Sequence, residues 1–411
     1  SRNQHVAIGS KALMLNTGTY PNTAVGYRSQ DSTTTGTANT SVGSYTLSVN
    51  KTGINNTAIG NAAMYESTGG NNNTAVGNDA GRKIKVDFNT AIGASALSAD
   101  TTGTYNTAVG YFALNTTTKG VENVGIGVQS NLYGDSTSYT TAVGTNAAYY
   151  NRRNNTTAMG YGALFFNSYG SNSFPYISTN LNQGKSNTAV GFQSSYFNNQ
   201  GSRNTSLGYR ANIGPSVFNA GSIRNVAIGD SALANNLNAG NTAVGSVALG
   251  INNGIQNTAI GDSAMAATTR ADQNEAMGFN ALKSLKNVNA AGYWNTALGG
   301  QAMEYDTSAY ATVAVGFRAL RNPKKVSESV AVGVGAMESG DSTYWNTAVG
   351  RGALFNFGHS NENTAVGTWA MSNKKEGVWN TAVGVVALEQ DSSGIGNTGI
   401  GTSAFRNNKQ S

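Results

Sequence analysis

Residues 56–60 read Asn-Thr-Ala-Ile-Gly, and the same motif returns as Asn-Thr-Ala-Val-Gly at residues 73–77 and 106–110. Its glycine recurs 23 times between Gly9 and Gly401, and fifteen of the 22 spacings equal the seventeen positions that separate Gly60 from Gly77. So short a period has no room for a pair of helices, whereas a β-branched segment between Asn and Gly is typical of a strand between turns. We therefore predict an all-β fold, a β-solenoid of 23 coils in which each coil pairs with its neighbours.

Apolar positions recur at fixed distances from the motif glycine. The residue just before it is always Val, Ile, Leu or Met, as at Val76 and Val109, and the fourth residue after it is usually Leu or Met. We expect both positions to fill a narrow core between two short strands per coil. The residue two before the glycine is small and apolar, although it lies on the opposite face of the strand. A symmetric homotrimer would cover that face; alternatively, these small residues lie near the corners of a single-chain solenoid and need no partner.

Asparagine and glycine mark the turns of each coil. The residue four before the glycine is usually asparagine, and we expect these side chains to stack as a ladder and to cap the turn backbone. The motif glycine is expected at a corner where φ is positive or where two backbone segments approach closely. Representative ladder residues are Asn56, Asn73 and Asn106 for the amides, and Gly60, Gly77 and Gly110 for the corners.

The composition excludes several kinds of chemistry. The 411 residues contain no cysteine and only two histidines, His5 and His359, with no acid or nucleophile at a suggestive spacing. This leaves no disulfide, no thiolate metal site and no Cys nucleophile, so we expect no enzyme activity, cofactor or metal. The net charge is +6, but its basic residues form no stripe or known motif, so we expect no nucleic-acid partner. No apolar run is long enough to cross a membrane.

These repeats resemble a known family. From Asn3 to about Phe405 the coil resembles the head repeats of trimeric autotransporter adhesins, the YadA-like left-handed β-roll. It is also similar to the Asn-Thr-Ala-Val/Ile-Gly arrays of phage tail-fibre proteins. The resemblance implies a left-handed β-roll, a parallel homotrimer, an extracellular location on a cell surface or virion fibre, and attachment to a host. The coil is longer than the usual head repeat, and no heptad stalk, β-barrel anchor or C-terminal chaperone domain follows, which suggests processing or truncation at Ser411.

The array is predicted to be one continuous domain, residues 3–411, with loop insertions near 165–184, 212–221 and 283–294, where the spacing lengthens. The first insertion and its neighbouring coils carry aromatic residues among Asn, Gln and Ser. They are a candidate surface patch for a glycan or receptor, or they cover the hydrophobic edge of a distorted coil. The candidate residues are Phe165, Phe166, Tyr169, Phe174, Tyr176, Tyr196 and Phe197. Trp294, Trp345 and Trp379, each five before a motif glycine, are expected to pack over the turn and not to bind a ligand.

Two functions remain open from the sequence. The first is a structural and adhesive fibre segment that displays surface loops to a cell-surface glycan, a protein receptor or a matrix. The second is a subunit of a self-assembling extracellular filament, because the array shows no polar caps and solenoids normally need them for solubility.

Overall fold

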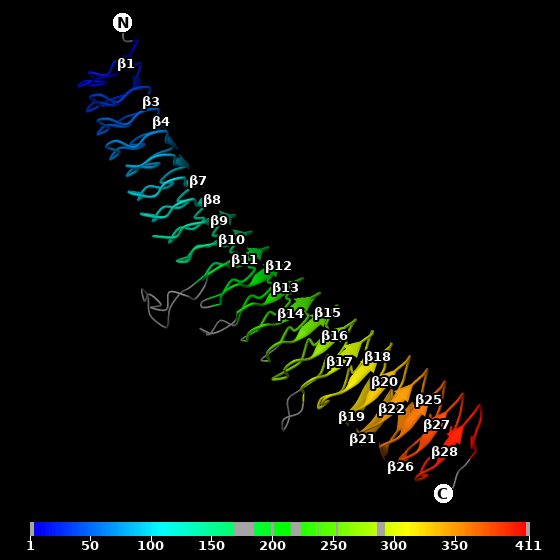
Figure 1. The fold of residues 1–411 in the computed structure, drawn as a ribbon. Coiled ribbons are helices and arrows are strands. Elements are labelled where there is room, and N and C mark those ends of the chain that lie inside the picture. Colours follow the sequence, from blue (N-terminus) through cyan, green and yellow to red (C-terminus); the bar gives the residue numbers. More distant parts are fainter. Residues whose placement is uncertain are drawn as a thin grey trace. The chain divides into compact units, whose positions relative to one another are not determined.

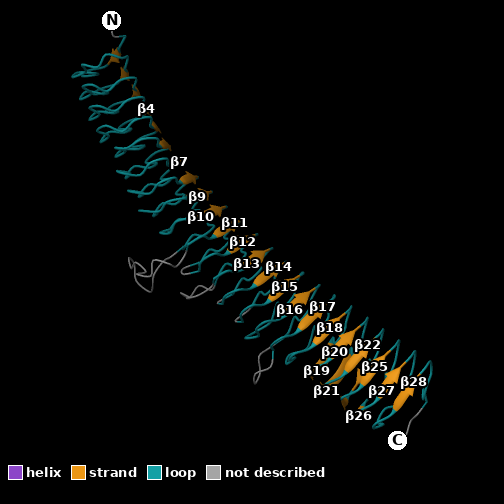
Figure 2. Ribbon diagram, in the orientation of Figure 1, coloured by secondary structure: helices purple, strands orange, loops and turns teal. Residues whose placement is uncertain are grey.

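Two compact units make up the computed structural model, Ser1–Leu207 with Ser216–Ala220, and Gly208–Pro215 with Gly221–Ser411. The structure describes residues 4–167, 185–198, 201–214, 223–236, 238–251, 254–285 and 292–407. Within these ranges all regular elements are β-strands and turns, and no helix is present (Figure 2). Each unit is a parallel β-solenoid in which a coil takes about seventeen residues, which confirms the predicted fold class (Figure 1).

In the first unit, every copy of the motif forms a short strand. Pairing is parallel and in register, so that Thr57 lies beside Thr74, Ala58 beside Ala75 and Ile59 beside Val76. The strands are β1 (Val6–Ile8), β2 (Thr23–Val25), β3 (Thr40–Val42), β4 (Thr57–Ile59), β5 (Thr74–Val76), β6 (Thr90–Ile92), β7 (Thr107–Val109), β8 (Val124–Ile126), β9 (Thr140–Val143), β10 (Thr156–Met159), β11 (Thr188–Val190) and β12 (Thr205–Leu207).

The second unit repeats this arrangement and adds two small sheets. Its motif strands are β13 (Val226–Ile228), β14 (Thr242–Val244), β15 (Thr258–Ile260), β16 (Glu275–Met277), β17 (Thr296–Leu298), β18 (Val313–Val315), β20 (Val330–Val332), β22 (Thr347–Val349), β25 (Thr364–Val366), β27 (Thr381–Val383) and β28 (Thr398–Ile400). A three-stranded sheet joins β19 (Asn322–Ser327), β21 (Ser339–Tyr344) and β23 (Asn356–Phe357), and a two-stranded sheet joins β24 (His359–Asn361) and β26 (Glu376–Val378).

Variations in repeat length leave the register intact. The longest spacing, from Gly160 to Gly191, still places Ala158 of β10 beside Ala189 of β11, and the long spacing from Gly278 to Gly299 places Ala276 of β16 beside Ala297 of β17. The strands on either side of a long spacing therefore pair as those of ordinary coils do. Most of the predicted insertions, at residues 168–184, 215–222 and 286–291, lie outside the described residues.

The motif glycines have the conformation that the sequence predicted. Gly60 has φ +129°, Gly77 +136° and Gly110 +135°. A Cβ added to Gly60 would lie 2.5 Å from the carbonyl oxygen of Gly77, and the same close approach recurs from coil to coil. A side chain at this corner would therefore be strained by its φ and would also collide with the next coil.

The core has a different composition from the predicted one. The buried position on the strand is the alanine two residues before the glycine, as at Ala58, Ala75 and Ala108. Leu or Met four residues after the glycine is buried as predicted, for example Met64 and Leu114. The Val or Ile just before the glycine, including Val76 and Val109, lies on the outward face and is half-buried or exposed. The prediction that these side chains fill the core is therefore wrong.

Space inside the coil explains this choice of face. Where the position two before the glycine is itself glycine, at Gly125, an added Cβ would lie 2.8 Å from Cγ of Leu114 in the preceding coil. The position therefore faces the buried leucine ladder directly, and the interior has no room for a β-branched side chain there.

Turns replace the predicted second strand in most described coils. Ala62 and Met64 have φ of 53° and 51°, and the same two positions are left-handed in most other described coils. Such a conformation costs roughly 1–2 kcal/mol for a residue other than glycine. It is offset in part because the Met64 amide donates to the Ala80 carbonyl of the next coil at 3.0 Å and the side chain is buried. Regular second strands occur only around β19–β26 among the described residues.

Candidate functional site

An aliphatic face covers the outer side of the motif strands in each unit. We define it as the side chains that directly precede the motif glycines; Ile59 and Ile92 are each 40% exposed. Exposed rings one residue after the glycine extend it, and Tyr161 and Phe192 stack there with centroids 5.4 Å apart. Single exposed hydrophobic residues are ordinary, but a continuous row in register is typical of a contact surface between proteins.

The predicted aromatic patch is in part a packed double column. Tyr149, Phe165 and Tyr196 stack face to face with centroids 4.8 and 4.9 Å apart. Beside them, Phe166 stacks between Tyr150 and Phe197 at 5.4 and 5.8 Å. All six rings are half-buried and the two columns meet edge to face.

This packing favours one of the two interpretations of the patch. Neighbouring rings cover most of the ring faces, so mainly the ring edges remain for a ligand. The arrangement therefore favours a cover over the edge of the coil and not a binding surface. The other three candidates, Tyr169, Phe174 and Tyr176, lie outside the described residues.

The predicted asparagine ladder is present. The Asn56 amide N–H donates to Oδ1 of Asn39 at 2.9 Å, and Oδ1 of Asn56 accepts from the amide of Asn73 at 2.9 Å. The Asn56 side-chain nitrogen also donates to the Gly70 carbonyl at 2.7 Å. Asn106 makes the equivalent bonds to Asn89, Asn123 and Gly120. Each buried side-chain amide thus satisfies two backbone groups of the next coil.

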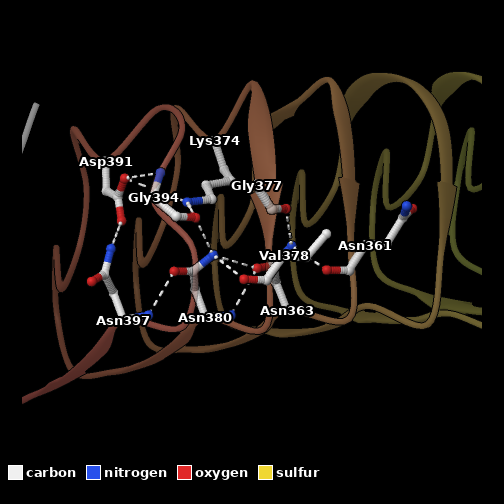
Figure 3. A network of polar contacts seen from close by, with 9 residues as sticks. All are labelled: Asn361, Asn363, Lys374, Gly377, Val378, Asn380, Asp391, Gly394 and Asn397. Carbon is white, nitrogen blue, oxygen red and sulfur yellow. Dashed lines mark hydrogen bonds and ion pairs between the residues drawn. The ribbon is translucent and has the colours of Figure 1, made fainter. Parts of the chain in front are cut away.

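Figure 3 shows how this ladder joins a buried ion pair in the second unit. Lys374 and Asp391 are both buried, with Nζ and Oδ1 3.4 Å apart. Lys374 also donates to the Gly394 carbonyl at 2.7 Å, and Asp391 accepts from the Gly394 amide at 2.7 Å. Burial lowers the pKa of Lys374, although Asp391 opposes this effect. Sequence reasoning missed the pair, although its members occupy the same position of two adjacent coils.

Two further aspartates occupy the same interior column without a cation. Asp100 and Asp306 are seven residues after their motif glycines, as Asp391 is, and both are buried. Burial raises the pKa of each to about 7, although hydrogen bonds from backbone amides oppose the rise. In Asp306, Oδ1 accepts from the Ser308 amide at 2.9 Å, and Oδ2 is buried with no hydrogen-bond partner.

The two histidines have different surroundings. Nδ1 of His5 accepts from the Asn22 amide at 3.0 Å and takes the place of a ladder asparagine. Exposed His359 has Nε2 3.8 Å from Asp341, which also pairs with Lys324 at 2.5 Å. That acidic neighbour lies in the preceding coil, and sequence reasoning missed it.

Two findings concern other kinds of site. Among the described residues, no group of three or more His, Cys, Asp and Glu side chains is placed to hold a metal ion. The described part of the chain also has no helix that is long and apolar enough to span a membrane.

The tryptophans five before the motif glycine differ from their prediction. Trp294, Trp345 and Trp379 are 56%, 55% and 61% exposed, so they are less closely packed than the prediction implied. Each indole nitrogen donates to a side chain of the preceding coil, namely Gln273, Glu328 and Glu362, respectively. The separation of each Glu–Trp pair by one full repeat was the available signal in the sequence.

Comparisons with protein-family models, with curated proteins and with solved structures found no match to this chain. The family resemblance of the repeats therefore stays a prediction.

Proposed function

We propose that this chain is a structural and adhesive fibre segment, displayed outside the cell or on a virion, that attaches to a surface glycan or protein receptor. The observation that carries the proposal is the aliphatic face. It recurs in register along each unit, whereas the interior is already filled by alanine, leucine and methionine. A repeat protein with one apolar outer face is suited to self-association along its length.

We propose that the aliphatic face packs against further copies of this chain. Two copies of one repeat array have the same rise per coil. Equivalent side chains of parallel copies therefore lie side by side along the whole array. By resemblance, the assembly is a parallel homotrimer. Packing of Val and Ile side chains between copies would remove from water the apolar surface that the single chain leaves exposed. This association would stabilise the segment without disulfides, of which it has none.

The oligomer is tested with charges on the aliphatic face. Ile59→Lys/Ile92→Lys/Ile126→Lys would place three ammonium groups in the contact between copies, where an unpaired charge is costly. The control Asn55→Lys/Asn72→Lys/Gln256→Lys adds the same charge at exposed positions five before the motif glycine. Light scattering and native mass spectrometry should give a trimer for the wild type and the control, and monomers for the aliphatic-face variant.

Other outcomes would contradict the proposal in different ways. A monomeric wild type would remove the trimer, and a trimeric lysine variant would place the interface elsewhere. Long filaments in negative stain would favour the alternative, a self-assembling filament subunit. Adhesion itself is tested by binding of the wild-type oligomer to cultured cells and to a glycan array, and no binding to either would refute it.

A further inference from the structure

Glutamate and tryptophan alternate along one exposed edge of the second unit. Glu328, Trp345, Glu362 and Trp379 occupy the same position in four successive coils, each five residues before its motif glycine. We call these four residues the tryptophan column. All four side chains are exposed, and the column lies at the corner that precedes the motif strands β20, β22, β25 and β27.

Hydrogen bonds fix the orientation of each indole ring. Nε1 of Trp345 donates to Oε2 of Glu328 at 2.8 Å, and Nε1 of Trp379 donates to Oε2 of Glu362 at 2.8 Å. An indole N–H lies in the plane of its ring, and donor and acceptor belong to adjacent coils. The ring plane therefore runs along the stack, and the ring faces point away from the coils above and below.

Rings at the same position of the first unit have a different arrangement. Phe88 and Tyr105 lie face to face, with centroids 5.1 Å apart and planes 4° apart. Each of these two rings therefore covers one face of the other. In contrast, Trp345 has only a tilted contact with Tyr344 at 6.1 Å, and in the described part of the chain Trp379 has no ring contact. The indole faces of the tryptophan column are thus oriented by the protein and carry no stacked ring, and more than half of the surface of each tryptophan is exposed.

We propose that the tryptophan column binds an extended, β-linked polysaccharide, with pyranose rings on the indole faces. The two tryptophans are two coils apart, roughly 9.6 Å at the usual strand separation. This matches the disaccharide repeat of an extended β-1,4-linked chain, so sugar units of the same orientation would meet both rings. The apolar C–H face of a pyranose packs on an aromatic face, while its equatorial hydroxyls point sideways toward acceptors.

The carboxylates supply the polar half of such a site. Glu328 and Glu362 each use Oε2 for the indole, and their Oε1 atoms are not part of that bond. An oxygen beside each ring suits a sugar hydroxyl. A protein partner would instead favour one contiguous apolar patch, whereas here a charged group separates the two rings. The inference rests on the proposed function, because it names the ligand class for the adhesive role.

Removal of the rings tests the site. Binding of the wild-type oligomer to cellulose and chitin is measured by co-sedimentation, and binding to cellohexaose and chitohexaose by calorimetry, with amylose as the α-linked comparison. We expect binding to at least one of the β-linked polymers. Trp345→Ala and Trp379→Ala should each weaken it by about tenfold, and the double variant should abolish it.

Three further variants separate a binding role from a folding role. Trp369→Ala removes a half-buried tryptophan of the same unit, one that contacts Phe355 and Arg351 and lies outside the column, and it should bind as the wild type does. Glu362→Gln should retain most binding, because Gln273 holds Trp294 in the same way at 2.7 Å. Glu362→Ala should weaken binding, because it releases the Trp379 ring.

Several results would overturn the inference. These are a wild type that binds none of the β-linked polymers, a double variant that still binds, or an equal loss in Trp369→Ala. A wild type that attaches to cells without binding these polymers would overturn the inference and leave the proposed function intact. If the double variant loses the polymers but still attaches to cells, the column is a polysaccharide site and the cell receptor binds elsewhere.

Discussion

Each unit has a buried carboxyl group whose pKa is raised by burial, Asp100 in the first and Asp306 in the second. At the interior position seven after the motif glycine, Asn50 accepts from the Gly53 amide at 2.9 Å, and Asp100 accepts from the Gly103 amide at 2.8 Å in the same geometry. An asparagine amide therefore fits this column as well as a carboxyl group does. The difference is the charge, which burial disfavours.

Replacement of Asp306 by asparagine should remove part of the pH dependence of the second unit. The folded-state pKa is about 7 and the usual value is 3.8, so the protonated form is favoured in the fold. The stability that this group contributes is complete below pH about 4, declines as the pH rises, and is lost above pH about 7. Asp306→Asn should thus gain on the order of 2–4 kcal/mol over the wild type above pH 7.

The measurement is urea unfolding of wild type and variant between pH 3 and pH 9. Asp230→Asn, at an exposed position of the same unit, serves as the control and should run parallel to the wild type. Parallel curves for Asp306→Asn as well would show that burial does not raise this pKa.

At the scale of the element, a coil is held to its neighbours by ladders of two kinds. The motif strands pair through their backbones, and the asparagine ladder links each strand start to the turns of the adjoining coils. Because the asparagine side chains are buried, removal of one leaves backbone donors and acceptors that water cannot reach.

Two adjacent asparagines of the first unit offer a matched comparison. Asn56→Ala would leave the Asn73 amide and the Gly70 carbonyl without their partner and should cost about 2–4 kcal/mol. The Asn55 side chain is exposed and bonds only to that of Asn72, at 3.2 Å, so Asn55→Ala should lose clearly less stability than Asn56→Ala, even with the backbone cost of alanine at its left-handed φ of 58°. Denaturant midpoints together with hydrogen exchange at the Asn73 amide measure both effects. Equal losses would mean that the buried ladder adds little beyond strand pairing.

At the scale of the molecule, each unit is a sum of nearly equivalent coils. The register of β4 with β5 and that of β5 with β6 are the same, although the second spacing is shorter by a single residue. Coils that contact only their neighbours in this way behave as a one-dimensional array. The loss of one whole coil should therefore be much less harmful than the loss of half a coil.

Deletion of residues 61–77, one full coil, should leave a folded first unit in which β4 pairs directly with β6. Deletion of residues 61–68 alone should disrupt the first unit, because the residues after the deletion would no longer lie beside their equivalents in the preceding coil. Circular dichroism and hydrogen exchange of the strands on both sides report the outcome. Similar spectra and exchange for the two deletions would refute the array description.

The repeat, the register, the glycine corners and the asparagine ladder could all be predicted from the sequence. These follow from identical residues at a fixed period, as in Asn56, Asn73 and Gly60, and each involves only residues of adjacent coils. Local spacing is enough to predict such contacts, because a parallel stack brings equivalent positions side by side.

Which face of each strand is the interior could not be predicted, because it depends on how the whole coil packs. Alternation places Ala58 and Ile59 on opposite faces, but both are apolar, so the pattern is the same for either choice. The decision depends on the width of the coil: the buried position faces the leucine ladder directly, as the close approach of Gly125 to Leu114 shows, and in other coils it holds a buried alanine such as Ala58. The aliphatic ladder is thereby turned outward. The exposure of Trp345 and Trp379 likewise depends on where the corner of the coil lies, since there the side chain meets a glutamate of the preceding coil and not the core.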